Sequence, residues 1–453
     1  MSPDTIRSQV ARARQTYGFS DFHGQSLRMR FARGAFWSLA GTGVCQGLTL
    51  LALMITARIL GREVFGKLGI IQSTVAMLGT LAGTAMGLTA TKFVAHYRDA
   101  EPERTGRVIG LNTMVSVGAG GIMAGILYMF AGDLAGGTLK SPEMAGPLRT
   151  AALLLFFHAW NAAQQGVLAG FEAFGTIALV NSARGLVTVL GTVWATIHWQ
   201  LSGAVWGLTV AAALACGSSA LAIRLETRRQ GLCIRWLSAW SERRVLWCFS
   251  LPAVLGGAMV APINWLVCVF LAHQPHGYAE LGIFNAANQW RLGLAFIPNV
   301  LTQSALPILA NLFSRGDRRP YKKAIILNVI LSTCISVAIA VPLLVGAKLV
   351  MRSYGRGFES GTLTLVLMLL AGVLNTVCSV VGGVIASSGR MWFSLLLNLL
   401  WALALLLTAA LFVPLHGAAG LGAAYLLSYV LHSAWQSVYL VFALKRDAPP
   451  ANQ

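Results

Sequence analysis

Acidic residues are scarce in this chain of 453 residues, which has only 15 Asp and Glu against 34 Lys and Arg. None of the acids falls in the middle of a long apolar run. The two nearest to such a position, Glu172 and Glu280, lie at the ends of apolar runs. A cation buried in an apolar run therefore has no carboxylate beside it.

Cysteine is also sparse, and the seven residues occur singly, without a CxxC or a Cys/His pairing. We therefore expect no disulfide and no metal site. No nucleotide-binding motif is present, so we expect no cofactor. The first thirty residues lack a short apolar core followed by a small-residue cleavage site, which favours a retained tail over a signal peptide.

Apolar residues dominate what remains, at 56% of the chain against 11% charged residues. With a mean hydropathy of +0.68, this composition is typical of an all-α polytopic membrane protein whose solvent is the lipid bilayer. The formal charge of +19 could indicate nucleic acid binding. The basic residues lie in alternate loops, however, which is the pattern of membrane topology, so no nucleic acid partner is expected.

Runs of about twenty apolar residues, the length that crosses a bilayer, recur along the whole chain. We predict about 12 transmembrane helices, at 34–58, 68–90, 108–131, 148–169, 175–198, 202–223, 245–272, 281–311, 324–347, 361–386, 391–413 and 418–444.

Most of the 34 Lys and Arg lie in the N-terminal tail and after every second span, which places those segments and both termini in the cytosol. The linker between the halves is rich in Trp and resembles an interfacial connector. We expect a basic cytosolic tail at 1–30, a first lobe at 31–224, a cytosolic linker at 225–244, a second lobe at 245–444 and a cytosolic tail at 445–453.

The two halves share four short matches in the same order, at offsets of 213 to 217 residues. FGKLGIIQ at Phe65 matches YAELGIFN at Tyr278, and LSGA at Leu201 matches LHGA at Leu415. The other two matches are RVIGLN with KAIILN, and VLA with VIA, each of the last pair followed fourteen residues later by Asn. We predict two six-helix repeats, which are parallel because six is even, around a central cavity.

Polar side chains inside the predicted spans gather on one face of several helices, at about 100° per residue. Span one carries such a stripe, which includes Thr49. Arg291 points about 100° away from the stripe of its own helix. The candidates for substrate binding are His158, Asn161, Gln165, Asn181, Arg184, Asn285, Asn288, Gln289, Arg291, Asn299 and Gln303.

Asn, Gln, Ser and Thr in spans often only link helices by hydrogen bonds, and a histidine can be a satisfied packing residue. An arginine at mid-span is different, because it costs about 2.5 to 3.5 kcal/mol and stays protonated. Arg184 lies about nine residues, or roughly 14 Å, from the cytosolic end of its helix. Either it snorkels or bonds a carbonyl, or it faces a water-filled cavity that admits an anion.

A cation in a cavity without a fixed counter-anion suits a substrate that carries its own negative charge. Phosphate and pyrophosphate bind guanidinium through paired hydrogen bonds, and the Asn and Gln side chains suit hydroxyl-rich cargo. A sugar joined to a phosphate would suit both the cation and these amide side chains.

The segment ARILGREVFGKLGIIQSTVAML resembles the junction of spans one and two in oligosaccharide flippases of the polysaccharide transport group. The resemblance covers about residues 30–445, including GAAGLGAAYLLSYVL at the start of span twelve. It implies a V-shaped two-lobed transporter of the bacterial inner membrane. Its substrate would be an undecaprenyl-pyrophosphate-linked oligosaccharide, moved by alternating access for polysaccharide or exopolysaccharide biosynthesis, with Arg184 and Arg291 as cationic cavity residues. Other polysaccharide assembly proteins are candidate partners.

Two other functions remain open on the sequence. A multidrug exporter of the same superfamily commonly uses an intramembrane carboxylate, which this chain lacks at mid-span. A membrane enzyme acting on lipid-linked sugars would need acid or base groups in an outer loop. The longest outer loop offers only Asp133 and Glu143, so we expect a transporter and not an enzyme.

Overall fold

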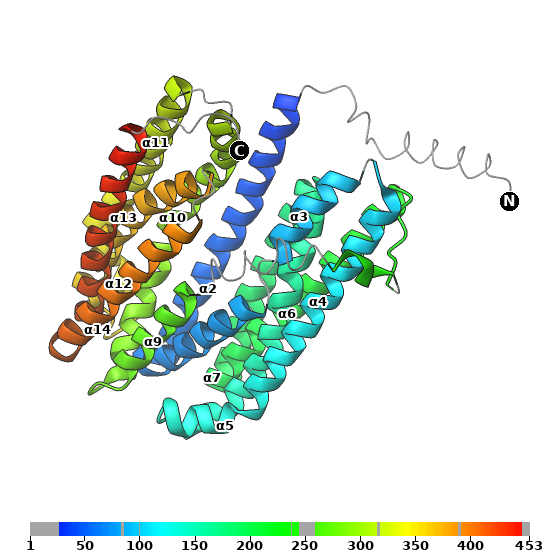
Figure 1. Cartoon of the computed structure of the whole chain (residues 1–453). Coiled ribbons are helices and arrows are strands. Elements are labelled where there is room, and N and C mark those ends of the chain that lie inside the picture. The colour runs from blue at the N-terminus through cyan, green and yellow to red at the C-terminus, as the bar shows by residue number, and fades with distance from the viewer. Residues whose placement is uncertain are drawn as a thin grey trace.

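The computed structural model describes residues 27–82, 86–98, 100–236, 238–243, 259–314, 318–387 and 391–445. Within these ranges every regular element is a helix, which confirms the all-α prediction. The helices form two groups that lie side by side in Figure 1. The first helix group runs from α2 to η3, and the second from α9 to α14.

The bounds of the elements in the first helix group are α2 Leu27–Leu81, α3 Met86–Tyr97, α4 Pro102–Met129, α5 Ala131–Asp133, the π-helix η1 Leu134–Thr138, the 3-10 turn η2 Pro142–Met144, α6 Ala145–Gly170, α7 Phe174–Arg229 and the 3-10 turn η3 Ala239–Glu242. Those in the second are α9 Val260–Ala272, α10 Gly277–Ser314, α11 Arg318–Val345, α12 Ala347–Ser353, the 3-10 turn η5 Glu359–Gly361, α13 Thr362–Ser387 and α14 Met391–Lys445.

The predicted spans coincide with these helices. In the described ranges, six helices are long and apolar enough to cross a membrane, and three of these (α2, α7 and α14) are each long enough for two crossings. Two predicted spans fall partly outside the described residues. In span two these are residues 83–85, between the end of α2 at Leu81 and the start of α3 at Met86. The first part of span seven lies outside the described residues, which resume at Met259.

Each of the three long helices folds back on itself at a kink. The kink of α2 is at Gly61, with φ 71° and ψ 171°. The kinks of α7 and α14 have nearly the same conformation, with φ 49° and ψ −129° at Gln200 and φ 52° and ψ −125° at Gly417. Positive φ favours glycine, so Gln200 is the strained member of the pair.

The residues after these two kinks are packed in the same way. A Cβ on Gly203 would overlap the carbonyl of Ala195, and a Cβ on Gly420 would overlap the carbonyl of Phe412. These two similarly packed glycines are 217 residues apart. The sequence match of LSGA with LHGA pairs Gly203 with Gly417 instead, so it differs from this correspondence by three residues.

The two helix groups cross closely where α2, after its kink, meets the start of α10. A Cβ on Gly66 would overlap the carbonyl of Tyr278, and one on Gly282 would overlap the carbonyl of Arg62. Small residues let two helices approach this closely, as is common within membranes. The largest buried hydrophobic cluster continues across the crossing, from Phe65 to Phe284.

The helix α7 continues to Arg229, into the first residues of the predicted linker 225–244. The linker then returns along α4. The carboxylate of Glu242 in η3 forms ion pairs with Arg104 and Arg107 at 3.2 and 3.3 Å. Arg235 forms an ion pair with Glu103 at 2.8 Å. These ion pairs attach the linker to the first helix group.

Candidate functional site

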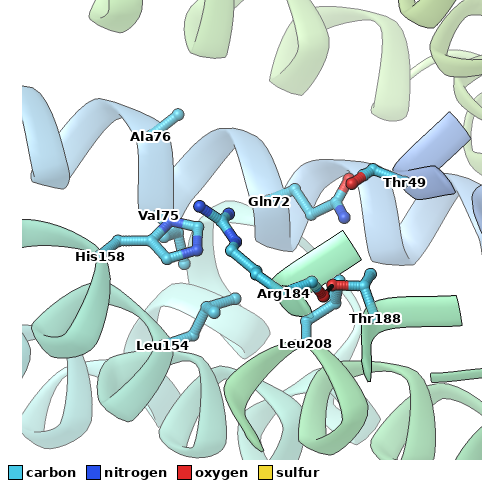
Figure 2. Close-up of a pocket in the computed structure, with 9 residues that line it drawn as sticks. All are labelled: Thr49, Gln72, Val75, Ala76, Leu154, His158, Arg184, Thr188 and Leu208. Carbon is cyan, nitrogen blue, oxygen red and sulfur yellow. Dashed lines mark hydrogen bonds between the residues drawn. The ribbon is translucent and has the colours of Figure 1, made fainter. Parts of the chain in front are cut away.

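Arg184 faces a cavity of about 200 Å³ inside the first helix group. Figure 2 shows its guanidinium extending from α7 toward α2, between the side chains of His158 and Gln72. The cavity walls come from α2, α6 and both halves of α7. The lining residues are Thr49, Gln72, Val75, Ala76, Leu154, His158, Arg184, Thr188 and Leu208.

Close packing of α7 against the first half of α2 positions Arg184. A Cβ on Gly41 would overlap Ala178, and one on Gly185 would lie 3.1 Å from Cys45, so both glycines permit the approach. The Thr188 hydroxyl, one turn later, donates to the main-chain oxygen of Arg184 at 2.8 Å. The arginine side chain is thus held on a close-packed helix and directed into the cavity.

The Arg184 guanidinium is half-buried and has no hydrogen bond or ion pair with any residue that the structure describes. None of the cavity residues is acidic. The cavity therefore carries a net positive charge from Arg184. The hydroxyls of Thr49 and Thr188, the amide of Gln72 and the imidazole of His158 also line it. Such a surface can bind an anion, above all one with several acceptor oxygens.

The other predicted polar residues of the first helix group have different surroundings. The amide of Asn161 is buried and donates to the hydroxyl of Ser219 at 3.1 Å, and Gln165 donates to the same hydroxyl at 3.5 Å. These bonds join α6 to the second half of α7. Asn181 is half-buried on α7, almost one turn before Arg184.

Arg291 is placed very differently from Arg184. It is only 6% exposed, and its Nε donates to the side-chain oxygen of Asn288 at 2.9 Å. Its guanidinium carbon lies 5.4 Å from the ring centroid of Tyr425, a cation–π distance. Arg291 does not line the cavity of Arg184.

The predicted polar stripe along α10 is divided among several local contacts. Asn285 presses against Gly69 of α2 at the crossing of the helix groups. Asn299 accepts a hydrogen bond of 3.0 Å from Ser379 of α13. Gln289 is half-buried, and Gln303 is exposed. The structure therefore does not bring this stripe to the Arg184 cavity.

Gln72 lines the cavity but was not among the predicted site residues. It is the last residue of the repeated segment FGKLGIIQ, and its counterpart in YAELGIFN is Asn285. An amide at matching positions of the two halves was the available signal. Sequence alone could not place it opposite Arg184, because that depends on how far α2 folds back at Gly61.

A second set of contacts joins the two helix groups near the N-terminus of α10. We call it the clasp, and its residues are Lys67, Thr138, Leu139, Glu143, His273 and Tyr278. The π-helix η1 ends at Thr138, and Lys140 has φ 50°, so the last carbonyls are free of helical bonds. His273 binds the Thr138 oxygen at 2.7 Å, and Tyr278 donates to the Leu139 oxygen at 2.5 Å.

Charged groups reinforce the clasp. Lys67 binds Glu143 at 2.9 Å and lies 5.5 Å from the ring centroid of Tyr278. A hydrogen bond from Ser141, together with Lys67, lowers the pKa of Glu143 to about 2. This carboxylate stays ionised at every physiological pH.

Comparisons with known proteins identify a family, curated relatives and solved structures that this chain resembles. A family model described as "Polysaccharide biosynthesis protein" matches residues 31–313. The EPS I polysaccharide export inner membrane protein EpsE of Ralstonia nicotianae is 23% identical over 421 residues, covering 92% of this chain and 94% of that protein. The lipid III flippase of Escherichia coli K12 is 22% identical over 409 residues, covering 89% of this chain and 96% of its own.

Among solved structures, an inward-facing multidrug resistance transporter of the MATE family, in the MOP superfamily, superposes with a TM-score of 0.72. It is 14% identical and covers 92% of this chain and 100% of its own. At this identity the likeness shows the fold alone.

Proposed function

The chain belongs to the family of polysaccharide biosynthesis proteins, and we propose that it is a flippase that moves a lipid-linked oligosaccharide across the bacterial cytoplasmic membrane. The relatives that match almost their whole length are a polysaccharide export protein and a lipid III flippase, which supports this function over an enzymatic one. The translocated oligosaccharide would be used for polysaccharide or exopolysaccharide synthesis.

The proposal depends on the guanidinium of Arg184, which pairs with none of the described residues and faces a cavity with no carboxylate among its lining residues. A drug exporter that binds organic cations would place a negative charge there, so the charge of this cavity favours an anionic substrate. We assign the pyrophosphate of the lipid carrier to Arg184, with His158 as a neighbouring contact. The geometry favours a packing role for Arg291, since its polar partners lie within its own helix group.

The protein is a multi-pass inner membrane protein, and we propose that both of its termini are cytosolic. The excess of Lys and Arg in the tail and alternate loops supports this orientation. Single cysteines in a cysteine-free background test it. A single cysteine introduced as Arg235→Cys should react with a membrane-permeant thiol reagent but not with an impermeant one added from outside.

We also propose that the two helix groups are six-helix repeats forming a V-shaped transporter. The matching kinks at Gln200 and Gly417, and the equivalent packing of Gly203 and Gly420, support the duplication. In the proposed orientation the clasp lies on the outer side, so this conformation is closed to the outside. Alternating access would then require the clasp to open.

Depletion of the protein in its native cell tests the proposed function. Lipid-linked oligosaccharide repeat units should accumulate in the inner leaflet, because synthesis continues while transfer stops. Mass spectrometry of extracted lipid-linked glycans, combined with an impermeant glycosidase or lectin on intact spheroplasts, would locate them. If depleted cells kept full outer-leaflet exposure of the glycans, the proposal would be wrong.

A further inference from the structure

The Arg184 cavity is too small for an oligosaccharide. Pockets that bury a drug-sized ligand, which is about the size of a disaccharide, occupy roughly 300–1,000 Å³. This cavity of about 200 Å³ falls below that range and suits one compact polyatomic group. If the proposed function is right, the part of the substrate that enters it is the phosphate linkage, and the sugars lie outside.

Two halves of α2 supply polar groups opposite Arg184. Thr49 lies twelve residues before the kink at Gly61 and Gln72 lies eleven residues after it. At 1.5 Å per residue they are about 18 and 17 Å from the kink, so the fold-back brings them to the same depth. Figure 2 shows both side chains on the side of Arg184 away from His158, and both line the cavity.

Neither polar side chain has a hydrogen-bonding partner within the described residues. The Gln72 amide offers two N–H donors and the Thr49 hydroxyl offers one, while the guanidinium of Arg184 offers a forked pair. A single phosphate that engages the arginine in paired geometry leaves the amide and hydroxyl without a charged acceptor. A second phosphate joined to the first would supply one.

We propose that Gln72 and Thr49 form a second phosphate subsite, so that the cavity selects a diphosphate over a monophosphate. This inference rests on the proposed function and adds a specificity to it. The transporter would recognise the diphosphate linkage common to its lipid-linked substrates and would reject phospholipids and lipid monophosphates. Because the sugars lie outside the cavity, substrates with different glycans would bind the subsite equally.

The test measures binding of inorganic pyrophosphate and inorganic phosphate to the purified full-length transporter, by isothermal titration calorimetry in magnesium-free buffer. We expect pyrophosphate to bind at least tenfold more tightly than phosphate. Gln72→Leu should bring the ratio of the two affinities close to one, with phosphate affinity nearly unchanged. Thr49→Val, which keeps the side-chain shape, should lower the ratio less. Gln230→Leu, at the exposed residue that follows α7, is the matched control and should keep the parent ratio.

Arg184→Ala should weaken the binding of both anions, which separates this inference from the proposed function. Equal affinities for the two anions in the parent, or a Gln72→Leu ratio equal to that of the parent, would overturn the second subsite. The proposed function would still stand if Arg184→Ala abolished flipping. If neither anion bound and Arg184→Ala flipped normally, both proposals would fail. Should Gln72→Leu not fold, Thr49→Val alone decides the question.

Discussion

The hydroxyl of Tyr278 donates a hydrogen bond of 2.5 Å to the main-chain oxygen of Leu139, and the two residues belong to different helix groups. The neighbouring bond from His273 to Thr138 repeats this arrangement at 2.7 Å. Side chains of one group thus hold the backbone of the other. Such bonds form only when the groups are together at this end, which makes them direct reporters of the closed state.

Fixing the clasp should stop transport. In a cysteine-free background, the pair Thr138→Cys and His273→Cys should react with a short bifunctional thiol crosslinker, since Thr138 and His273 are exposed and in contact. Flipping in proteoliposomes should fall in proportion to the crosslinked fraction. Each single variant, treated identically, is the control. Undiminished flipping by fully crosslinked protein would contradict alternating access through this end.

Weakening the clasp should favour the open state. Tyr278→Phe removes one hydrogen bond worth about 1 kcal/mol, which shifts the equilibrium roughly fivefold. A reporter cysteine at Thr49 should then be labelled faster by an impermeant reagent added from the outer side. Tyr439→Phe, which changes a tyrosine of the second helix group away from the clasp, should leave the rate unchanged. A labelling rate in Tyr278→Phe equal to that of the parent would count against the assigned role.

Glu143 should stabilise the protein without pH dependence in the physiological range. The hydrogen bond from Ser141 and the contact with Lys67 lower its pKa from 4.5 to about 2. A lowered pKa means that the stabilisation is present above the unfolded value and is lost as the pH falls toward 2. The difference in thermal stability between parent and Glu143→Gln should thus be constant from about pH 8 to about pH 5 and should shrink below about pH 4.5. A difference that shrinks between neutral pH and pH 5 would contradict the assignment.

The two equivalent kinks predict opposite effects of substitution. Gln200→Gly should raise stability by about 1 kcal/mol, because glycine adopts the positive φ without strain. Gly417→Ala should lower it, because a Cβ there would lie 2.6 Å from a carboxylate oxygen of Glu280. Thermal unfolding of the purified variants measures both. A Gln200→Gly variant less stable than its parent would mean that the glutamine side chain contributes more than the strain costs.

Arg291 should matter for stability more than for transport. Arg291→Ala leaves Asn288 without its partner and opens space in a packed core, which together cost about 2–4 kcal/mol. We expect less inserted protein and a lower melting temperature, with near-normal flipping per surviving molecule. Arg291→Met, which restores volume, should recover part of the stability. A stable but inactive Arg291→Ala protein would instead place this cation in the transport pathway.

The sequence predicted the helices well because a bilayer demands about twenty apolar residues for each crossing, a pattern that does not depend on tertiary contacts. It also singled out Arg184, because its charge has no acidic residue near it in the chain. In the second half of the chain, Glu280 is the acid nearest to a mid-span position. It accepts a hydrogen bond from the main-chain N–H of Ala418, just after the kink of α14.

The partners of polar side chains could not be predicted in the same way. Helical periodicity places Asn161 on the face of His158, yet Asn161 bonds Ser219 while His158 lines the cavity. Arg184 and Arg291 are both mid-helix cations in the sequence, and only tertiary packing separates the unpaired one from the paired one. The positions of the kinks decide these contacts, and no local sequence signal identified Gln200 as one of them.

If Arg184 receives the negative charge of the substrate, its substitution should change the amount of surface polysaccharide per molecule of membrane-inserted transporter. Arg184→Ala should be inserted normally but abolish or strongly reduce output, because the charge it removes is unpaired within the described structure. Arg184→Lys should keep partial output, since the charge survives without the paired geometry, and Arg184→Glu should be inactive. Arg149→Ala, at an exposed arginine near the start of α6, should match the parent. Normal output per inserted molecule from Arg184→Ala would contradict the account and leave Arg184 as a packing residue.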